Sequence, residues 1–199
     1  MASGGPPGVE NGEPKPSSRW YSGRGDDGTT GLLGPGRVPK FDLRPATCGA
    51  VDEAQAAIGL ARAAGCAPDV CSVLLAVQAD LSALMAELAA AGTEDGQFPA
   101  QISAAHITQL ETWLAGVEAA IDPPRTFVLP GSTLPGAALH LARAVVRRAE
   151  REAVRLLDSG LLSNPHVLRY LNRLSSLLFL LACAEDARFA NRASMPGNP

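Results

Sequence analysis

The sequence is poor in aromatic residues, in cysteine and in net charge. Aromatic residues make up 5% of the 199 positions, and the formal net charge is -3. Without an excess of positive charge, nucleic acid is not an expected partner. The four cysteines form no C-x-x-C pair, and the three scattered histidines add no zinc-like spacing. We therefore expect reduced, structural thiols at all four positions: Cys48, Cys66, Cys71 and Cys183.

Long apolar runs are also missing. The longest, from Leu177 to Ala184, is too short to span a bilayer, and no apolar signal-peptide core lies near the N-terminus. We therefore expect no membrane association and a cytoplasmic location. Residues 1–19 are dominated by glycine, proline, serine and glutamate, a composition that cannot bury enough surface to offset its ordering entropy. This segment is expected to be a disordered tail, and residues 191–199 a second, flexible one.

Helical periodicity fills most of the chain. Apolar residues repeat with helical spacing over residues 49–190, and no strand of convincing length interrupts them. Proline and glycine signals divide this region into helices at about 50–64, 68–91, 103–121, 134–159 and 164–188. This pattern predicts an all-α, up-and-down five-helix bundle. The second and fifth helices are apolar beyond a single stripe, which favours an oligomer.

The fourth predicted helix carries an unusual number of arginines. Five lie within residues 140–157. Three of them repeat every four residues and so share one face: Arg143, Arg147 and Arg151. This face adjoins the apolar stripe, so part of the arginine row should be half-buried. Arginine offers a fixed fork of donors suited to phosphate or carboxylate. The alternative interpretation is an ordinary solvated salt-bridge face.

A glycine-rich segment precedes the helices. Residues 22–40 contain six glycines, two threonines and three basic residues. Glycines let backbone N–H groups approach an anion closely, and Lys40 could add a positive charge. The segment is not a Walker A loop, because no Gly-Lys-Ser/Thr precedes a helix. It is either an anion-binding loop within a segment spanning residues 20–48 or a flexible extension of the tail.

Four other residues stand out in the sequence. Asp52 and Glu53 fall in the first turn of the first predicted helix, where acids complement the helix dipole. Phe127 lies in a short loop bounded by prolines and is either a core plug or functional. Asn172 interrupts the apolar fifth helix and needs a hydrogen-bond partner, from the protein or from a ligand.

Five blocks of sequence follow one another in a distinctive order. They are Tyr21-Ser-Gly-Arg-Gly-Asp-Asp-Gly-Thr-Thr30; Gly36-Arg-Val-Pro-Lys40; Val51-Asp-Glu53 with Gly59; Phe127-Val-Leu-Pro-Gly131 leading through His140 and Arg143 to Arg147-Arg-Ala-Glu-Arg151; and Tyr170-Leu-Asn-Arg-Leu-Ser175. Together they resemble the PduO-type ATP:cob(I)alamin adenosyltransferases over about residues 20–188. The chain departs from the family pattern at four places. Ser22-Gly23-Arg24 replaces the family's Thr-Arg-Thr, Ala54-Gln55 replaces Leu-Asn, Ser132 replaces a glycine and Ser176 replaces an aspartate.

The resemblance implies a fold, a reaction and partners. The fold would be the ferritin-like bundle of this family, assembled as a homotrimer with active sites between subunits. The reaction would transfer the 5′-deoxyadenosyl group of ATP to cobalt(I) of cobalamin or a related corrinoid, releasing triphosphate, with Mg²⁺ present. A cobalamin reductase and an adenosylcobalamin-dependent mutase are the protein partners that this chemistry suggests. The alternatives are a bundle that binds corrinoid or ATP without catalysis, as a carrier or sensor, and a purely structural bundle.

The resemblance also implies roles for individual residues. Those expected to bind ATP are Ser22, Gly23, Arg24, Gly25, Thr30, Lys40, Arg147, Arg148, Glu150, Arg151 and Asn172. Those expected to bind cobalamin are Asp52, Phe127 and Arg143, with Arg143 paired to Asp52. Arg147 and Phe127 would be catalytic. Phe127 would occupy the lower face of the corrin, keep the lower axial ligand away and make reduction to cobalt(I) easier. No protein ligand for Mg²⁺ is implied, because the ion would come with the triphosphate.

Overall fold

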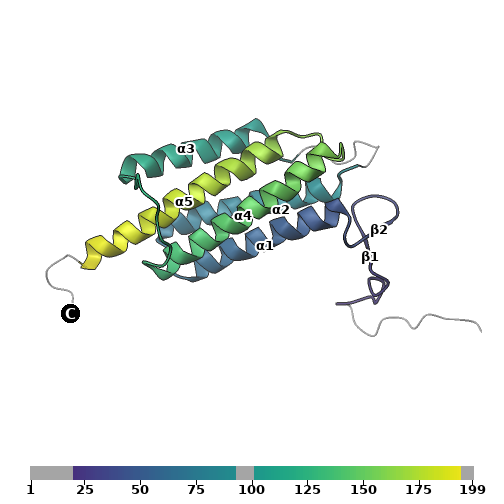
Figure 1. Ribbon diagram of the computed structural model, residues 1–199, viewed down its shortest axis with the longest axis horizontal. Helices are drawn as coiled ribbons and strands as arrows, with labels where there is room; N and C mark the ends of the chain where they lie inside the picture. Colours follow the sequence, from purple (N-terminus) through teal and green to yellow (C-terminus); the bar gives the residue numbers. More distant parts are fainter. Residues whose placement is uncertain (1–19, 93–100, 194–199) are drawn as a thin grey trace, which may run out of the picture.

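Five long helices form an elongated bundle in the computed structural model, which describes residues 20–92 and 101–193 (Figure 1). The helices are α1 (Leu43–Ala63), α2 (Pro68–Ala89), α3 (Ala104–Ala120), α4 (Leu134–Asp158) and α5 (His166–Ala193). A small hairpin of β1 (Thr29–Gly31) and β2 (Arg37–Pro39) projects from the end of the bundle where α1 begins. The predicted all-α five-helix bundle is thus confirmed. Both predicted tails lie outside the described residues, except that α5 continues through residues 191–193.

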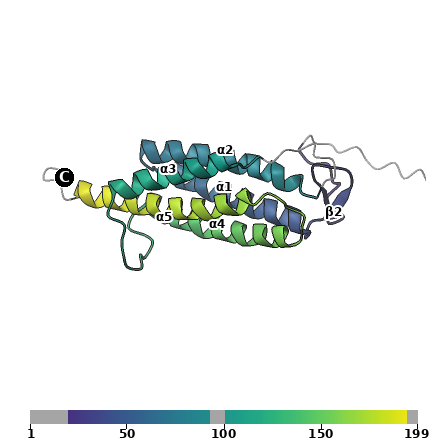
Figure 2. The ribbon, with the colours of Figure 1, turned by 90° about the horizontal axis from the view of Figure 1, so that it is seen from above.

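The apolar stripes predicted from the sequence meet in one core. α1 packs on α2 and α4, and α5 packs on α4 and α3 (Figure 2). Leu74, Leu84 and Leu139 are among the fully buried side chains. The core also contains Tyr170, whose hydroxyl donates a hydrogen bond to Asp80 Oδ2 at 2.9 Å. Burial is the main reason that the pKa of this phenol is raised, so it stays protonated and serves as a donor.

The start of α1 is the main correction to the predicted helix boundaries. α1 begins at Leu43 rather than near Ala50, because the Asp42 side chain accepts the backbone N–H of Arg44 as an N-cap. Residues 43–48, assigned above to the loop segment, are therefore helical. Asp52 and Glu53 lie in the interior of α1, so the dipole interpretation of these acids is wrong. At the other end of the chain, α5 runs past Arg188 to Ala193.

The glycine-rich segment is ordered as a hairpin. Thr29 pairs with Pro39, Thr30 with Val38 and Gly31 with Arg37 in an antiparallel register. These three-residue strands are too short for a clear period-two pattern, which is why the sequence showed no strand. The alternative interpretation, a flexible extension of the tail, is wrong for this part of the segment. The predicted loop after α2 falls mostly on residues 93–100, outside the described residues.

Apolar surface remains on the outside of the bundle. By length and composition alone, α2 and α5 could each cross a membrane, a test that core helices of soluble proteins also pass. The apolar window of α5 is 61% buried within the fold, but that of α2 is only 28% buried. Leu75 on α2, Leu60 on α1 and Leu141 on α4 are all exposed. The expected apolar excess is present on α2, whereas oligomerisation and the absence of a membrane stay predictions.

All four cysteines are free thiols, as predicted. Burial raises the pKa of the Cys48 thiol to about 11 and that of Cys66 to about 12. Both are therefore protonated at neutral pH, which fits structural rather than reactive cysteines.

Replacing Gly136 by alanine should destabilise the bundle. Gly136 lies in the first turn of α4, where the Thr133 hydroxyl accepts its N–H at 2.9 Å and donates to Asp186 Oδ1 at 2.6 Å. A Cβ at this position would overlap the Asp186 carboxylate and lie 2.8 Å from Thr133 Oγ1. We expect Gly136→Ala to lower the free energy of unfolding by about 1–3 kcal/mol, measured by denaturant titration, because the cap must open.

Gly116→Ala is the matched control for this prediction. Gly116 is an exposed position inside α3, and a Cβ there meets no atom within 4 Å. Alanine should stabilise it by about 0.5–1 kcal/mol, since glycine is a poor helix former. If Gly136→Ala were stabilising as well, Asp186 would have to move aside at no cost, and the cap argument would be wrong.

Candidate active site

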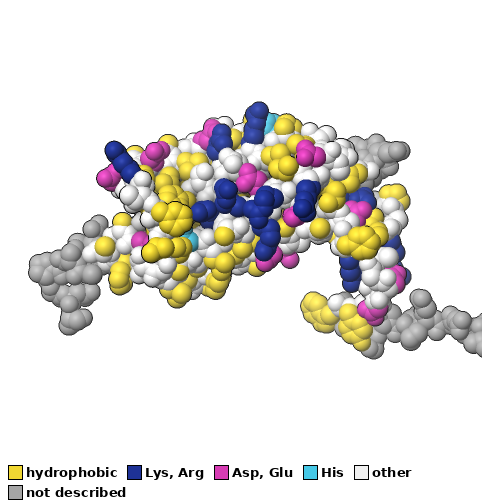
Figure 3. All heavy atoms as spheres, in the orientation of Figure 1, with side chains coloured by type: hydrophobic (Ala, Val, Ile, Leu, Met, Phe, Trp, Pro, Cys, Tyr) yellow, Lys and Arg dark blue, Asp and Glu magenta, His cyan; other side chains and the backbone are white. Residues whose placement is uncertain are grey.

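The arginines of α4 divide into paired and unpaired side chains. Figure 3 shows basic side chains gathered along the middle of the bundle, over α4. Arg148 forms an ion pair with Glu53 of α1 and so ties the two helices together. Arg147 is exposed and has no ion-pair partner within the described part of the chain. Arg151 bends back to donate to the Arg147 carbonyl oxygen at 3.0 Å. Arg147 is therefore a cation whose charge is not neutralised by the fold.

Asn172 has the hydrogen-bond partners that the sequence predicts it needs, and they form a network across three helices. Its Nδ2 donates to Glu150 Oε1 of α4 at 3.0 Å, and its Oδ1 accepts from Arg173 Nη1 at 3.0 Å. Arg173 Nε in turn donates to Glu111 of α3 at 3.0 Å. Because a carboxylate only accepts and a guanidinium only donates, the orientation of the amide is fixed. Asn172 keeps one N–H available for a ligand beside the arginine row.

In the glycine-rich segment, the hairpin brings two of the predicted phosphate ligands together. The Lys40 ammonium packs against Gly25, so closely that a Cβ there would lie 3.1 Å from Nζ. The Ser22 hydroxyl accepts the N–H of Arg24 at 3.3 Å, and the Thr30 hydroxyl bonds the adjacent Gly31 carbonyl at 3.4 Å. Both hydroxyls are thus used locally, whereas Gly25 and Lys40 form a compact cationic corner.

Phe127 is on the surface rather than in the core. Its side chain is 91% exposed, so the core-plug interpretation is wrong. In Figure 2 the α3–α4 loop that carries it projects away from the bundle. This loop borders a cavity of about 310 Å³ whose other wall is formed by His140, Arg143 and Phe179. An exposed ring at the rim of a cavity can pack against a flat apolar ligand or against another chain.

Two residues that line this cavity each hold a buried polar atom without a partner. His140 is buried, and neither its Nε2 nor Arg143 Nε has a hydrogen-bond partner in the described structure. Arg143 lies over the Phe179 ring, with Cζ 5.9 Å from the centroid, and His140 meets the same ring edge-on at 5.8 Å. Buried polar atoms normally find a partner. The lining of the cavity therefore combines the apolar rings of Phe127 and Phe179 with the polar side chains of His140 and Arg143.

The expected pair between Arg143 and Asp52 is not formed within one chain. Arg143 makes the ring contact described above, and no ion pair links it to Asp52, which is exposed on α1. It is the neighbouring acid, Glu53, that pairs with an arginine of α4, namely Arg148. Within the described residues, neither Asp52 nor Arg143 forms an ion pair.

Comparison with known proteins decides the family. The family model described as cobalamin adenosyltransferase matches residues 20–185. The corrinoid adenosyltransferase of Mycobacterium tuberculosis is 43% identical over 171 residues, which cover 83% of this chain and 87% of that protein. The cobalamin adenosyltransferase of Cupriavidus metallidurans is 42% identical over 170 residues, 85% and 86% of the two chains.

The chain belongs to the cobalamin adenosyltransferase family.

Solved structures agree with this family. A phenylalanine-to-alanine variant of the PduO-type ATP:corrinoid adenosyltransferase from Lactobacillus reuteri, complexed with cobalamin and ATP, superposes with a TM-score of 0.77. It is 28% identical, and the match covers 87% of this chain and 96% of that one. An arginine-to-lysine variant of the same enzyme, complexed with ATP, gives a TM-score of 0.75 at 29% identity. The resemblance inferred from the five sequence blocks is thus confirmed.

Three of the four departures from the adenosyltransferase pattern have local structural explanations. Gly23 has a φ of 70°, so its loop adopts a turn that an arginine at this position would disfavour. The Gln55 side chain joins α1 to α2, because its Oε1 accepts from the Ser82 hydroxyl of α2 at 3.4 Å. Ser176 bonds back to the Asn172 carbonyl at 3.5 Å within α5. Ser132 is exposed, and nothing in the structure explains its presence.

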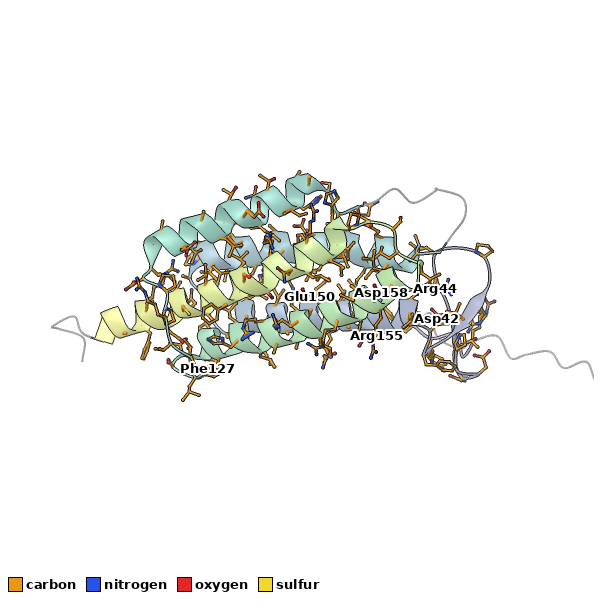
Figure 4. All side chains as sticks on the ribbon, turned by 45° about the horizontal axis from the view of Figure 1, so that its top comes forward. Asp42, Arg44, Phe127, Glu150, Arg155 and Asp158 are labelled. Atoms are coloured by element: carbon orange, nitrogen blue, oxygen red, sulfur yellow. The ribbon has the colours of Figure 1, made fainter. Side chains whose placement is uncertain are left out.

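The site residues of this adenosyltransferase lie at two separate places in one chain. In Figure 4, Phe127 lies near one end of the bundle, whereas Asp42 and Arg44, next to the hairpin, lie at the other. Glu150 lies between them on α4. The structure therefore gathers the arginine row, Asn172 and the Phe127 cavity along the bundle but not the glycine-rich loop.

Three residues of the cavity and the glycine-rich loop were not predicted as site residues from the sequence. Phe179 lies within an apolar stretch of the fifth helix, and nothing marks it out. His140 lies three residues before Arg143, a spacing that puts both on one face, and this signal could have found it. Arg37 was only part of a matching block, yet it makes three hydrogen bonds to the glycine-rich loop.

His140 should make folding stability sensitive to mild acid. Burial is the main reason that its pKa lies below the ordinary value; nearby Asp186 opposes the shift and Arg143 adds to it. The unfolded chain therefore binds a proton on His140 more readily than the folded protein does. The contribution of neutral His140 to folding stability is complete above about pH 6.5 and is lost as the pH falls through the lower folded-state pKa. The slope from one proton is at most about 1.4 kcal/mol per pH unit.

The measurement compares wild type with His140→Gln. Urea unfolding at pH 7.5 and pH 5.5 should show a larger loss of stability for the wild type, since the other titrating groups are common to both proteins. Parallel losses would mean that His140 takes up its proton equally well in the folded protein.

Proposed function

We propose that this chain transfers the 5′-deoxyadenosyl group of ATP to cobalt(I) of a corrinoid, forming adenosylcobalamin and releasing triphosphate. The observation that carries this proposal is the unpaired Arg147 on the same helix as Arg143 and His140, which line the Phe127 cavity. A cation left unneutralised by the fold suits a polyphosphate, and the cavity suits a large ring system with polar substituents. Membership of the family supplies the reaction that joins the two ligands.

In this reaction the corrinoid itself supplies the nucleophile. The electron pair of cobalt(I) forms a bond to the ATP 5′ carbon, and the C5′–O bond breaks with its electron pair leaving on triphosphate. No protein nucleophile is needed, which fits a site built of arginine, lysine, asparagine and backbone N–H groups. The protein has to hold the 5′ carbon in line with cobalt and to neutralise charge that accumulates on the leaving group.

Eight of the predicted site residues have a place in this scheme. Gly25, Lys40, Arg147 and Arg151 would contact the triphosphate, and the remaining N–H of Asn172 would contact the nucleoside. Glu150 holds the Asn172 amide, and Arg148 fixes α4 on α1 through Glu53. These two residues therefore shape the site rather than carry charge to the phosphates. Phe127 would lie against the lower face of the corrin and exclude an axial ligand.

Mg²⁺ would enter with the nucleotide. The described residues contain no group of three or more histidine, cysteine, aspartate or glutamate side chains able to hold a metal ion. Mg²⁺ is commonly held largely by substrate phosphates and water, with few protein ligands. We propose that it neutralises part of the triphosphate charge, together with the arginines.

We also propose a cytoplasmic homotrimer with its active sites between subunits. Its support is the separation of the glycine-rich loop from Phe127 in one chain, together with the exposed apolar side chains of α1 and α4. In such an assembly the loop of one subunit would meet α4 of the next, and Asp52 could pair with Arg143 across the contact. A cobalamin reductase would supply cobalt(I), and a mutase would use the product.

The test is an anaerobic assay of the full chain with ATP, Mg²⁺ and chemically reduced cob(I)alamin. We expect adenosylcobalamin, identified by its spectrum and light sensitivity, and one triphosphate per turnover. Binding of ATP and cobalamin without product would instead support the carrier or sensor alternative. Sedimentation at several concentrations tests the trimer separately.

A further inference from the structure

Arg37, at the start of β2, holds the glycine-rich loop through its guanidinium group. Its Nη2 donates to the carbonyl oxygens of Arg24 at 2.6 Å and of Thr29 at 3.0 Å. Its Nε donates to the Thr29 hydroxyl at 2.7 Å. One side chain thus binds two points that lie five residues apart in the loop, and the strand that carries it also leads to Lys40.

Asp27 completes this network. Its Oδ1 accepts both the N–H and the hydroxyl of Thr29 at 2.8 Å, and it lies 3.7 Å from Arg37 Nη2. The hydrogen bonds from Thr29 are the main reason that the pKa of this carboxyl is lowered, so it is ionised at neutral pH. Thr29 therefore donates to Asp27 and accepts from Arg37, an arrangement in which donors and acceptors match.

The bond to the Arg24 carbonyl also orients the next peptide N–H. No described peptide bond is cis, and in a planar trans peptide the C=O and N–H point in opposite directions. Because the Arg24 carbonyl points towards Arg37, the Gly25 N–H points away from it. Within the described residues this N–H has no acceptor. Gly25 is also the residue against which the Lys40 ammonium packs.

We propose that Arg37 is a positioning residue for the triphosphate of ATP, an inference that rests on the function proposed above. It sets the loop conformation in which the Gly25 N–H and Lys40 form one anion-binding corner. Arg37 acts through the loop and makes no contact with the nucleotide. Lysine cannot replace it, because a single ammonium lacks the planar fork that reaches two carbonyl oxygens and a hydroxyl at once.

The experiment compares Arg37→Lys and Arg37→Met with the wild type as full-length proteins. Calorimetry with inorganic tripolyphosphate as the probe measures anion binding without turnover, and steady-state assays give KM for ATP and for cob(I)alamin. We expect both variants to weaken tripolyphosphate binding and raise KM for ATP about tenfold or more, since several hydrogen bonds to a charged group are lost. KM for cob(I)alamin should stay within about twofold of wild type, and the melting temperature should stay within a few degrees.

Arg188→Met is the matched control. Arg188 also binds a carboxylate, that of Asp69 at 2.9 and 2.5 Å, but it is near the end of α5, away from the hairpin. This variant should leave tripolyphosphate affinity unchanged.

The outcomes separate this inference from the proposed function. Unchanged tripolyphosphate affinity in Arg37→Lys and Arg37→Met would overturn the positioning role. Equal increases in KM for ATP and KM for cob(I)alamin, together with a lowered melting temperature, would overturn it as well. If the tripolyphosphate affinity depends on Arg37 but the wild type forms no adenosylcobalamin, the proposed function alone is contradicted. A wild type that binds neither ATP nor tripolyphosphate would overturn both.

Discussion

Arg147→Met is expected to lower kcat/KM for adenosyl transfer by about 10²–10³-fold, the effect typical of removing one preorganised donor from a developing anion. Within the described chain no carboxylate neutralises this side chain, so its full charge is available to the leaving triphosphate. The folding stability should change by less than about 0.5 kcal/mol, because Arg147 is exposed. Anaerobic steady-state kinetics and urea unfolding measure the two quantities.

Two further variants make this result specific. Arg147→Lys keeps the charge but loses the fork, so it should recover only part of the activity. Arg155 lies on the same helix and is also exposed, but it pairs with Glu152 at 3.2 Å. Arg155→Met should therefore leave kcat/KM within about twofold of wild type. Equal losses in Arg147→Met and Arg155→Met would indicate a general electrostatic field rather than a contact with the leaving group.

The fold followed from the sequence where proline and glycine mark the ends of helices. Pro68 lies in the first turn of α2, and Gly160 follows α4, as the pattern predicted. The same reasoning failed at α1, because the predicted loop segment extends through Pro45 to residue 48. Proline is tolerated in a first turn, where its missing N–H would have no intrahelical partner. Asp42, three residues earlier, was the overlooked cap.

The site was less accessible to sequence reasoning than the fold. Helical spacing alone places Arg143, Arg147 and Arg151 on one face of α4, but it does not reveal that Arg147 is unpaired. That property depends on which carboxylates reach α4 from neighbouring helices, as Glu53 does for Arg148. Such pairs join residues far apart in the chain, and no local pattern encodes them.

The role of Arg37 depends on still finer detail. Its acceptors are backbone carbonyl oxygens, whose directions are set by the turns of the loop. Gly23 and Gly28 have φ values of 70° and 79°, a conformation that the sequence permits but does not require. Motif matching therefore identified the block that contains Arg37, whereas its function became apparent only from the hydrogen bonds.

Phe127→Ala should produce the second large loss, without any cost in stability. The side chain is 91% exposed, so its removal leaves no cavity in the core, and the free energy of unfolding should change by less than about 0.5 kcal/mol. We expect kcat to fall by about 10²-fold or more, equivalent to about 3 kcal/mol. The reason is that an axial ligand can then reach cobalt from the lower face and disfavour cobalt(I). KM for ATP should not change, because Phe127 would contact the lower face of the corrin and not the nucleotide.

Leu129→Ala distinguishes this role from loss of loop surface in general. Leu129 lies in the same loop and is 79% exposed, but it does not line the cavity bordered by Phe127, His140 and Arg143. It should keep wild-type kcat. If Phe127 acts on the cobalt, the defect of Phe127→Ala should be larger when the enzyme starts from cob(II)alamin with a reductant than when it starts from preformed cob(I)alamin. A defect of equal size in both assays would instead place Phe127 in corrinoid binding, because only the first assay includes the reduction step that an axial ligand opposes.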